Sequence, residues 1–275
     1  MGDLIVKDNA LIEASHRLGE VEQRLVLLAI LKGRKYCDSV EQLRGKELII
    51  HADDYITKFG GTQQGAYKAL KQAVMGLYRA EWGYKYLTNK GEQRVRYERF
   101  TQSADYGQGE GTVSFRFADA IIPMLVELER NFTTYEIKQV AELSSSYAMR
   151  LYEFFMQHLD KKAGKGWLDI SLDDLRFRFG LLPTEYKTMS NFKAYVLDFS
   201  LKQINTKTDL SATYTQRKQG RVIVGFRFEF ERKTNAKPKK TKEKTANIDL
   251  NNLTDQERDI IAQKNAYADS IGATA

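Results

Sequence analysis

The stretch ISLDDLRFRFG at residues 170–180 repeats, in altered form, the stretch IHADDYITKFG at residues 50–60. The two copies share an isoleucine, two adjacent aspartates and a final Phe-Gly pair without a gap. An Arg-Leu pair precedes each copy and an aromatic-Lys-Ala segment follows it: Arg24-Leu25 and Arg150-Leu151, then residues 67–70 and 192–195. Three matches in one order indicate two related domains.

Each half predicts the same elements in the same order. An apolar helix comes first, at about 19–32 and again at about 146–160, and a short strand follows it. The adjacent aspartates then open a second helix, because acidic side chains suit the positive end of a helix dipole. We therefore interpret these aspartates as caps and not as metal ligands. Gly60 and Gly180 are expected to end the second helix.

A third helix and a set of strands complete each half. The third helix is expected at about 63–79 and at about 190–205. Alternating residues predict three strands in the first half, at 81–87, 93–103 and 112–117, and a hairpin with its tip at 218–221 in the second half. Helix, strand, helix, turn, helix and hairpin is the order of a winged helix-turn-helix.

We therefore predict an α+β fold that consists of two tandem winged-helix (helix-turn-helix plus β-wing) domains with a flexible C-terminal tail. The first domain is expected at residues 1–130 and the second at residues 131–232. Residues 233–275 are expected to contain a Lys-rich linker and one short helix near 255–266.

The composition favours a polyanionic partner. Lysine and arginine total 43 against 36 acidic residues, which gives the 275 residues a net charge of +7 and a pI near 9.2. Such a pI is typical of nucleic-acid-binding proteins. The single cysteine, Cys37, excludes an internal disulfide and a multi-cysteine zinc site. No apolar run is long enough for a membrane span and no secretory signal opens the chain, so we expect a cytoplasmic protein.

In the first half, the third helix carries a cationic face. DNA-binding proteins of this type place that helix in the major groove, with residues near its N-terminal end on the base edges. The candidate DNA contacts on this helix are Gln64, Lys68, Lys71 and Arg79, and those on the first wing are Lys90, Arg94 and Arg96. Two alternatives stay open, namely an ordinary solvated helix face and a charged edge strand that resists aggregation.

In the second half, the third helix is less regular. We expect an apolar arc made of Phe192, Val196, Leu197, Phe199, Leu201 and Ile204. By α-helical geometry Lys193 points into this arc, so it can reach DNA only from the first turn. Asp198 is an unfavourable neighbour for a phosphate, which concentrates the expected contacts near the N-terminal end. The candidate DNA contacts of this half are Lys187, Asn191, Lys193, Lys202, Arg217, Lys218 and Arg221.

Signatures of catalysis are missing from the sequence. Gly60 and Gly65 have phosphate-loop spacing, but Ala66-Tyr67 follows where Lys-Ser/Thr is required. A rolling-circle nicking enzyme needs paired histidines near a tyrosine, and no such pair occurs among the three histidines. We therefore expect no catalytic residues, no metal site and no cofactor.

Several motifs resemble those of the iteron-binding plasmid replication initiators, a family of theta-type initiators. The opening NALIEASHRLGEVEQRLVLLAI, at 9–30, is similar to the start of the first winged helix in this family. The second half is more specific, with LSSSYAMRLYEFF at 143–155 and LDDLRFRFG at 172–180. The other family motifs are Tyr186 with Phe192-Lys193 and Val196-Leu197, Ile204-Asn205 with Thr208-Asp209, and Lys218-x-Gly220-Arg221. The resemblance covers about residues 5–232.

The resemblance implies a non-enzymatic initiator that binds direct repeats (iterons) in double-stranded DNA at a plasmid origin. Such proteins melt a nearby AT-rich region, recruit the host replication initiator and helicase, and as dimers repress their own gene. The resemblance also implies that the first domain is the dimer interface and that the second domain gives the main sequence-specific contacts. By this resemblance Lys193 is a contact of the recognition helix, and Lys218 and Arg221 are contacts of the wing.

Two other classes of protein fit the same elements. A tandem winged-helix transcriptional repressor would bind an operator and have no role in initiation. A structural adaptor would use its winged helices for protein contacts and would show no salt-dependent affinity for DNA.

Overall fold

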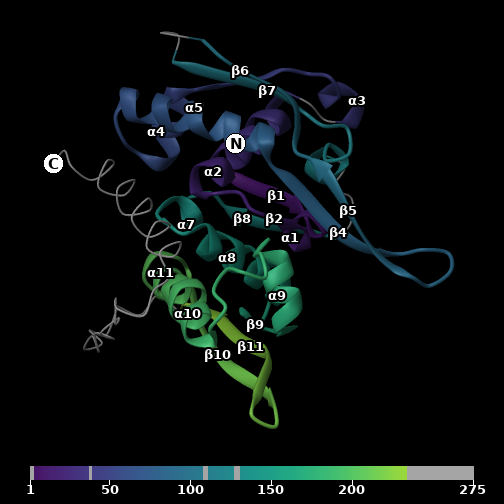
Figure 1. Cartoon of the computed structure of the whole chain (residues 1–275). Coiled ribbons are helices and arrows are strands. Elements are labelled where there is room, and N and C mark those ends of the chain that lie inside the picture. The colour runs from purple at the N-terminus through teal and green to yellow at the C-terminus, as the bar shows by residue number, and fades with distance from the viewer. Residues whose placement is uncertain (1–2, 37–38, 108–110, 127–130, 234–275) are drawn as a thin grey trace.

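The computed structural model describes residues 3–36, 39–107, 111–126 and 131–233, and it confirms the two winged-helix domains (Figure 1). The first winged helix is preceded by β1 (Leu4–Asp8), α1 (Asn9–Glu13) and β2 (Ser15–His16). Its elements are α2 (Glu20–Tyr36), α3 (Val40–Leu43), β3 (Leu48–His51), α4 (Ala52–Phe59), α5 (Gln63–Arg79), β4 (Glu81–Leu87), β5 (Gln93–Arg99), β6 (Thr101–Tyr106) and β7 (Thr112–Phe117).

The chain then continues through α6 (Pro123–Val126), β8 (Phe132–Glu136) and α7 (Lys138–Ala141) into the second winged helix. That module consists of α8 (Ser146–His158), β9 (Lys165–Ser171), α9 (Leu172–Arg178), α10 (Met189–Asn191), the π-helix η1 (Phe192–Asp198), α11 (Phe199–Lys207), β10 (Leu210–Gln219) and β11 (Val222–Arg232). Residues 234–275, with the predicted linker and short helix, lie outside the described residues.

The repeated aspartates lie in the first turn of each second helix, as expected, and the capping side chain is Asp54 in the first copy and Ser171 in the second. The backbone N–H of His51 donates to Asp54 Oδ2 at 3.1 Å, and the backbone N–H of Asp174 donates to Ser171 Oγ at 3.1 Å. Gly60 and Gly180 end the two helices with positive φ values of 77° and 64°, which favour glycine because it has no Cβ. The sequence match at 50–60 and 170–180 is thus a strand-cap-helix unit that occurs once in each domain.

The predicted strand at 93–103 is wrong as a single element. The strand is interrupted at Phe100, a core residue that is only 1% exposed. Before the break, β5 pairs with β4 in the sheet β2-β4-β5, and after it β6 pairs with β7 in the sheet β3-β7-β6. Burial of the Phe100 ring at the corner between two sheets is the physical reason for the break. The consequence is a β4–β5 hairpin, the first wing, that extends away from the domain (Figure 1).

The third helix of the second domain is longer than predicted and is not α-helical throughout. Residues 192–198 form a π-helix between α10 and α11. A π-helix has a wider turn than an α-helix, so the residues after it are rotated relative to an α-helical count. As a result, Phe199 is 49% exposed, and its expected place in the apolar arc is wrong. The other members of that arc are buried.

The two domains share buried contacts. Strand β1 pairs with β8 in an antiparallel two-stranded sheet that crosses the predicted boundary at 130/131. The two arginines of the internal repeat each reach the other side of that boundary. Arg24 Nη2 donates to the Ala141 carbonyl at 2.9 Å, and Arg150 Nη2 donates to the Ala14 carbonyl at 2.6 Å. The boundary itself stays a prediction.

Candidate nucleic-acid interface

The recognition helix of the second domain is the third helix, α10-η1-α11, which follows α9 after a turn. Thr188 caps its N-terminal end, because the Thr188 hydroxyl oxygen accepts the backbone N–H of Asn191 at 3.3 Å. Lys187 is exposed just before this cap, and Lys193 is half-buried in the first turn of η1. Lys202 is exposed on α11. Two of the three lysine candidates therefore lie at the N-terminal end, where contacts to base edges are expected.

Asp198 and Asn205 both contact strand β10. The hydroxyl group of Tyr214 donates to Asp198 Oδ1 at 2.8 Å. Burial, and then this bond to Asp198, raise the pKa of the Tyr214 hydroxyl group. The Asn205 side chain donates to the Ala212 carbonyl at 2.8 Å and accepts the Ala212 N–H at 2.6 Å. These two polar residues therefore fix the recognition helix to the base of the wing.

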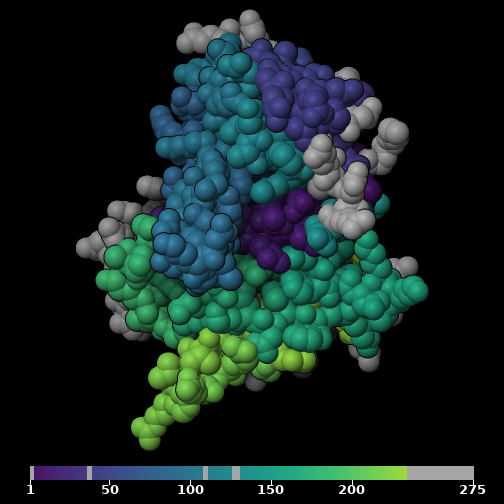
Figure 2. All heavy atoms as spheres, turned by 90° about the vertical axis from the view of Figure 1, so that its right-hand side faces the viewer, coloured from purple at the N-terminus to yellow at the C-terminus, as the bar shows by residue number. Residues whose placement is uncertain are grey.

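The second wing is the β10–β11 hairpin, which projects from the molecule (Figure 2). Its two-residue turn begins at Gly220, with a φ of 62°, as a tight hairpin requires. Lys218 and Arg221 are exposed at the tip. Arg217, in contrast, lies below a register shift in the strand and forms an ion pair with Asp169 at 2.5 Å.

The third helix of the first domain, α5, has the two faces that the sequence predicts. Its buried face is formed by Ala66, Ala69, Leu70, Ala73, Val74 and Leu77. Gln64, Lys68 and Arg79 are exposed on the other side. Lys71 is half-buried, and its ammonium group lies 4.3 Å from the centre of the Tyr106 ring.

The first wing carries the other three candidates. Lys90 is exposed at its tip, and Arg94 forms an ion pair with Glu92 at 3.2 Å. The guanidinium group of Arg96 lies 5.3 Å from the centre of the Tyr86 ring. Tyr86 belongs to the aromatic face that the alternation predicts, and Trp82, Tyr84 and Tyr86 lie along one side of β4.

Lys85 of this wing makes a contact that the sequence gives no sign of. Its ammonium group lies 2.5 Å from Asp174 Oδ1 and 4.7 Å from the centre of the Phe177 ring, both on α9. Hydrogen bonding to Lys85 lowers the pKa of the Asp174 carboxyl group. The first wing therefore contacts the second helix-turn-helix, and Figure 2 shows its blue spheres reaching the green second domain.

Most cationic candidates are not held by a carboxylate. Among the described residues, no ion pair engages any member of the following set: Lys68, Arg79, Lys90, Lys187, Lys193, Lys202, Lys218 and Arg221. Their charges are therefore available to an anionic partner without breaking an internal ion pair. Arg94 and Arg217 would first have to leave Glu92 and Asp169.

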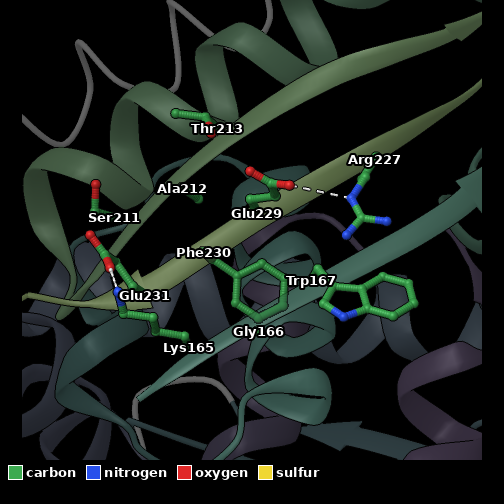
Figure 3. A pocket seen from close by; sticks show the side chains of 10 residues that line it. All are labelled: Lys165, Gly166, Trp167, Ser211, Ala212, Thr213, Arg227, Glu229, Phe230 and Glu231. Carbon is green, nitrogen blue, oxygen red and sulfur yellow. Dashed lines mark hydrogen bonds and ion pairs between the residues drawn. The ribbon is translucent and has the colours of Figure 1, made fainter. Parts of the chain in front are cut away.

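A shallow hollow lies on the outer face of the second sheet, away from its core (Figure 3). The Arg227 guanidinium group lies 4.5 Å from the centre of the Trp167 ring. Arg227 also pairs with Glu229 at 3.3 Å, and Lys165 pairs with Glu231 at 3.1 Å. The charged side chains that line the hollow therefore pair with one another.

Across residues 3–36, 39–107, 111–126 and 131–233, no group of three or more His, Cys, Asp or Glu side chains could hold a metal ion. Within these limits, no helix is both long and apolar enough to cross a membrane.

The fold and these surfaces define a tandem winged-helix protein with cationic recognition helices and wings. The family model described as "Initiator Replication protein, WH1" matches residues 4–156, and the one described as "Initiator Rep protein, WH2" matches residues 171–230. The chain therefore belongs to the family of initiator replication proteins, and the resemblance found in the motifs is confirmed.

Individual proteins are also similar to this chain in sequence or in fold. A "Replication initiation protein" of Escherichia coli is 24% identical over 238 residues, which are 84% of this chain and 72% of the relative. An "Uncharacterized 27.6 kDa protein" of Escherichia coli is 24% identical over 227 residues, or 80% and 92% of the two chains. The crystal structure of the Pi initiator protein in complex with iteron DNA matches with a TM-score of 0.67 and 22% identity, over 84% of this chain and 98% of that chain.

Proposed function

We propose that this protein initiates plasmid replication by binding direct repeats (iterons) in double-stranded origin DNA. The observation that carries the proposal is that the two family matches enclose both recognition helices and both wings. The similar fold of the Pi initiator, whose structure was solved with iteron DNA, supports the same partner. The protein uses no catalytic residue and no cofactor in this role.

The charge distribution supports DNA as the partner. Lysine and arginine side chains bind phosphate oxygens and the acceptor atoms of guanine. Lys187, Asn191 and Lys193 contact the major groove from the N-terminal end of the second recognition helix. Lys218 and Arg221 contact the backbone from the wing tip. Lys68, in the first domain, contacts a neighbouring groove segment together with Gln64 and Arg79.

Four of the remaining candidates have internal partners and contribute less. Lys71 and Arg96 lie over tyrosine rings, and Arg94 and Arg217 pair with carboxylates. Lys202 lies beyond the π-helix, and Lys90 reaches the DNA backbone from the tip of the first wing.

After binding, the protein opens the adjacent AT-rich DNA and recruits the host replication initiator and helicase. As a dimer formed through the first domain, it represses its own gene, and it acts in the cytoplasm. These steps are what the resemblance of the motifs to the iteron-binding initiators implies.

DNase footprinting on the DNA that flanks the gene of this protein, at two salt concentrations, tests the proposal. We expect a ladder of protected direct repeats that weakens steeply with salt, because binding releases counterions from the phosphates. A single protected palindrome would instead indicate a repressor without an initiation role. The absence of protection at low salt would remove the DNA-binding proposal and favour an adaptor of protein contacts.

A further inference from the structure

The turn of the second helix-turn-helix is fixed by one arginine side chain. Arg176, on α9, lies within the motif LDDLRFRFG. Its Nη2 atom donates to the Leu182 carbonyl at 2.9 Å and to the Glu185 carbonyl at 2.7 Å. Its Nη1 atom donates to the Tyr186 carbonyl at 3.4 Å. One guanidinium group thus satisfies three carbonyl groups of a turn that has no regular backbone ladder.

The same side chain also reaches the recognition helix. The Arg176 guanidinium group lies 5.6 Å from the centre of the ring of Phe192, the first residue of η1. Phe192 is buried in the core of the second domain. Arg176 therefore contacts both the turn and the start of the helix that the turn leads into.

The turn ends in a strained residue. Tyr186 has a φ of 45°, in the left-handed region that a side chain with a Cβ rarely adopts. Strain of this kind persists only where surrounding contacts hold it, and it is common at functional sites. Here the Tyr186 carbonyl is held by Arg176, and the next two residues are Lys187 and the cap Thr188.

Glu185 closes the turn from the other side. Its Oε2 atom accepts the backbone N–H of Leu182 at 2.8 Å, and its Oε1 atom accepts Arg17 Nη2 at 2.6 Å. Arg17 lies in the segment between β2 and α2, so the turn is also tied to the first domain. Gly180 contributes to this contact, since a Cβ there would lie 2.8 Å from the His16 carbonyl oxygen.

We infer that Arg176 is a positioning residue for DNA reading, which places the N-terminal end of the recognition helix through the turn at 182–186. The part of this inference that concerns DNA rests on the proposed function. Lys187, Asn191 and Lys193 follow the turn directly, so a shift of the turn moves all three together. Lys218 and Arg221 are on a separate hairpin and keep their places.

Two consequences separate positioning from a general role in folding. A displaced recognition helix loses contacts to bases, whereas phosphate contacts from the wing persist. Replacement of Arg176 should therefore lower the preference for the repeat over scrambled DNA more than it lowers binding to scrambled DNA. It should also speed amide hydrogen exchange at residues 187–191, with or without DNA.

The test compares Arg176→Lys with Arg178→Lys in the full-length protein. A lysine at 176 keeps the charge but cannot span three carbonyl groups and a ring. Arg178 is the matched control, because it is on the same helix and contacts Glu13 and Phe154 instead of the turn. We expect Arg176→Lys to lower the ratio of the affinities for repeat and scrambled DNA by about 10- to 100-fold. This change corresponds to the free energy of one or two lost hydrogen bonds.

The readouts have distinct outcomes. Parallel losses of affinity for the repeat and for scrambled DNA, or an unchanged ratio, would overturn the inference. Equal exchange rates at 187–191 in wild type and Arg176→Lys would overturn the inference, whatever the DNA titrations show. A wild-type protein with no preference for the repeat over scrambled DNA would instead count against the proposed function. If Arg176→Lys does not fold, Glu185→Gln tests the same turn, with a smaller fall of the ratio expected.

Discussion

A cationic side chain can bind DNA strongly when no carboxylate of the same protein pairs with it and when packing holds the aliphatic part of the side chain in place. Lys193 meets both conditions, since it is half-buried in the first turn of η1 and no described carboxylate pairs with it. The charge of Arg217 is less available, because its guanidinium group forms an ion pair with Asp169 at 2.5 Å. The two residues are equally cationic in sequence, and only the structure separates them.

Lys193→Ala should weaken binding to the direct repeat by about 1–3 kcal/mol, the range for a good contact to a base. Binding to scrambled DNA should change much less. Fluorescence anisotropy titrations at one fixed salt concentration measure both affinities. Lys161→Ala is the control, because Lys161 is exposed in the loop between α8 and β9. A repeat affinity equal to that of wild type would contradict the assignment of Lys193.

Arg221→Ala should act on a different quantity. Arg221 is at the tip of the second wing, where we expect a phosphate contact. Its loss should weaken binding to all DNA sequences alike and reduce the slope of log affinity against log salt by about 1. Titrations of wild type and variant at several salt concentrations give this slope. A change of sequence preference with an unchanged slope would show instead that Arg221 reads bases.

At the scale of elements, the sequence predicts local structure well and tertiary adjustments poorly. The caps at Asp54 and Ser171 depend on neighbours three residues apart, so they can be read from sequence. The π-helix and the break at Phe100 cannot, because each depends on how a ring or a helix packs against distant residues. Asp198 is an unfavourable neighbour for a phosphate by sequence, and in the structure its carboxylate accepts a hydrogen bond from the Tyr214 hydroxyl group instead.

The candidate site shows the same division. The exposure of Lys68 follows from helical periodicity, that of Lys187 from its place before a helix and that of Lys218 from its place at a hairpin tip, and the structure agrees. The internal partners of Arg94 and Arg96 are local and could have been anticipated from the strand register. The contact of Lys85 with Asp174 joins residues 89 positions apart, and no sequence pattern signals it.

Helix packing in the first domain predicts a pH dependence. Burial raises the pKa of the Glu22 carboxyl group, which lies on α2 against Gly76 of α5. The folded state therefore holds more protons than the unfolded state between the ordinary pKa and the raised value, and stability falls as pH rises through that window. Glu22→Gln does not titrate, so its melting temperature relative to wild type should increase from about pH 4 to about pH 7.

Thermal melting across this pH range measures the effect. The expected sign is a growing advantage of Glu22→Gln toward neutral pH. An advantage that is constant with pH, or that shrinks toward neutral pH, would contradict the account of the Glu22 environment.

At the scale of the whole molecule, a buried polar network joins the two winged helices. Lys7 Nζ and the Tyr135 hydroxyl group each donate to Glu153 Oε1 at 2.6 Å. Arg150 donates to carbonyls of Ala14 and Arg178 and contacts the His16 ring. Burial lowers the pKa of Arg150 to about 10, and burial followed by the charge of Arg150 lowers that of His16 well below its ordinary value. These contacts therefore connect the two surfaces that we propose to bind DNA.

Arg150→Met should separate the two domains thermodynamically. Loss of the Arg150 guanidinium group leaves the carbonyl groups of Ala14 and Arg178 without this donor, which costs about 1–3 kcal/mol for each group. Scanning calorimetry should show one cooperative transition for wild type and two for the variant. The control is Arg232→Met, which breaks the half-exposed ion pair with Asp209 and should cost about 1 kcal/mol or less. A single transition in Arg150→Met would show that the network does not couple the domains.

Hydroxyl-radical footprinting of one repeat duplex tests most directly whether both winged helices read the same repeat. We expect two protected patches on one face of the DNA, about one helical turn apart. Lys68→Ala should remove one patch and Lys193→Ala the other. A single patch that only Lys193→Ala removes would contradict the account, because it would leave the first winged helix without a role in reading DNA.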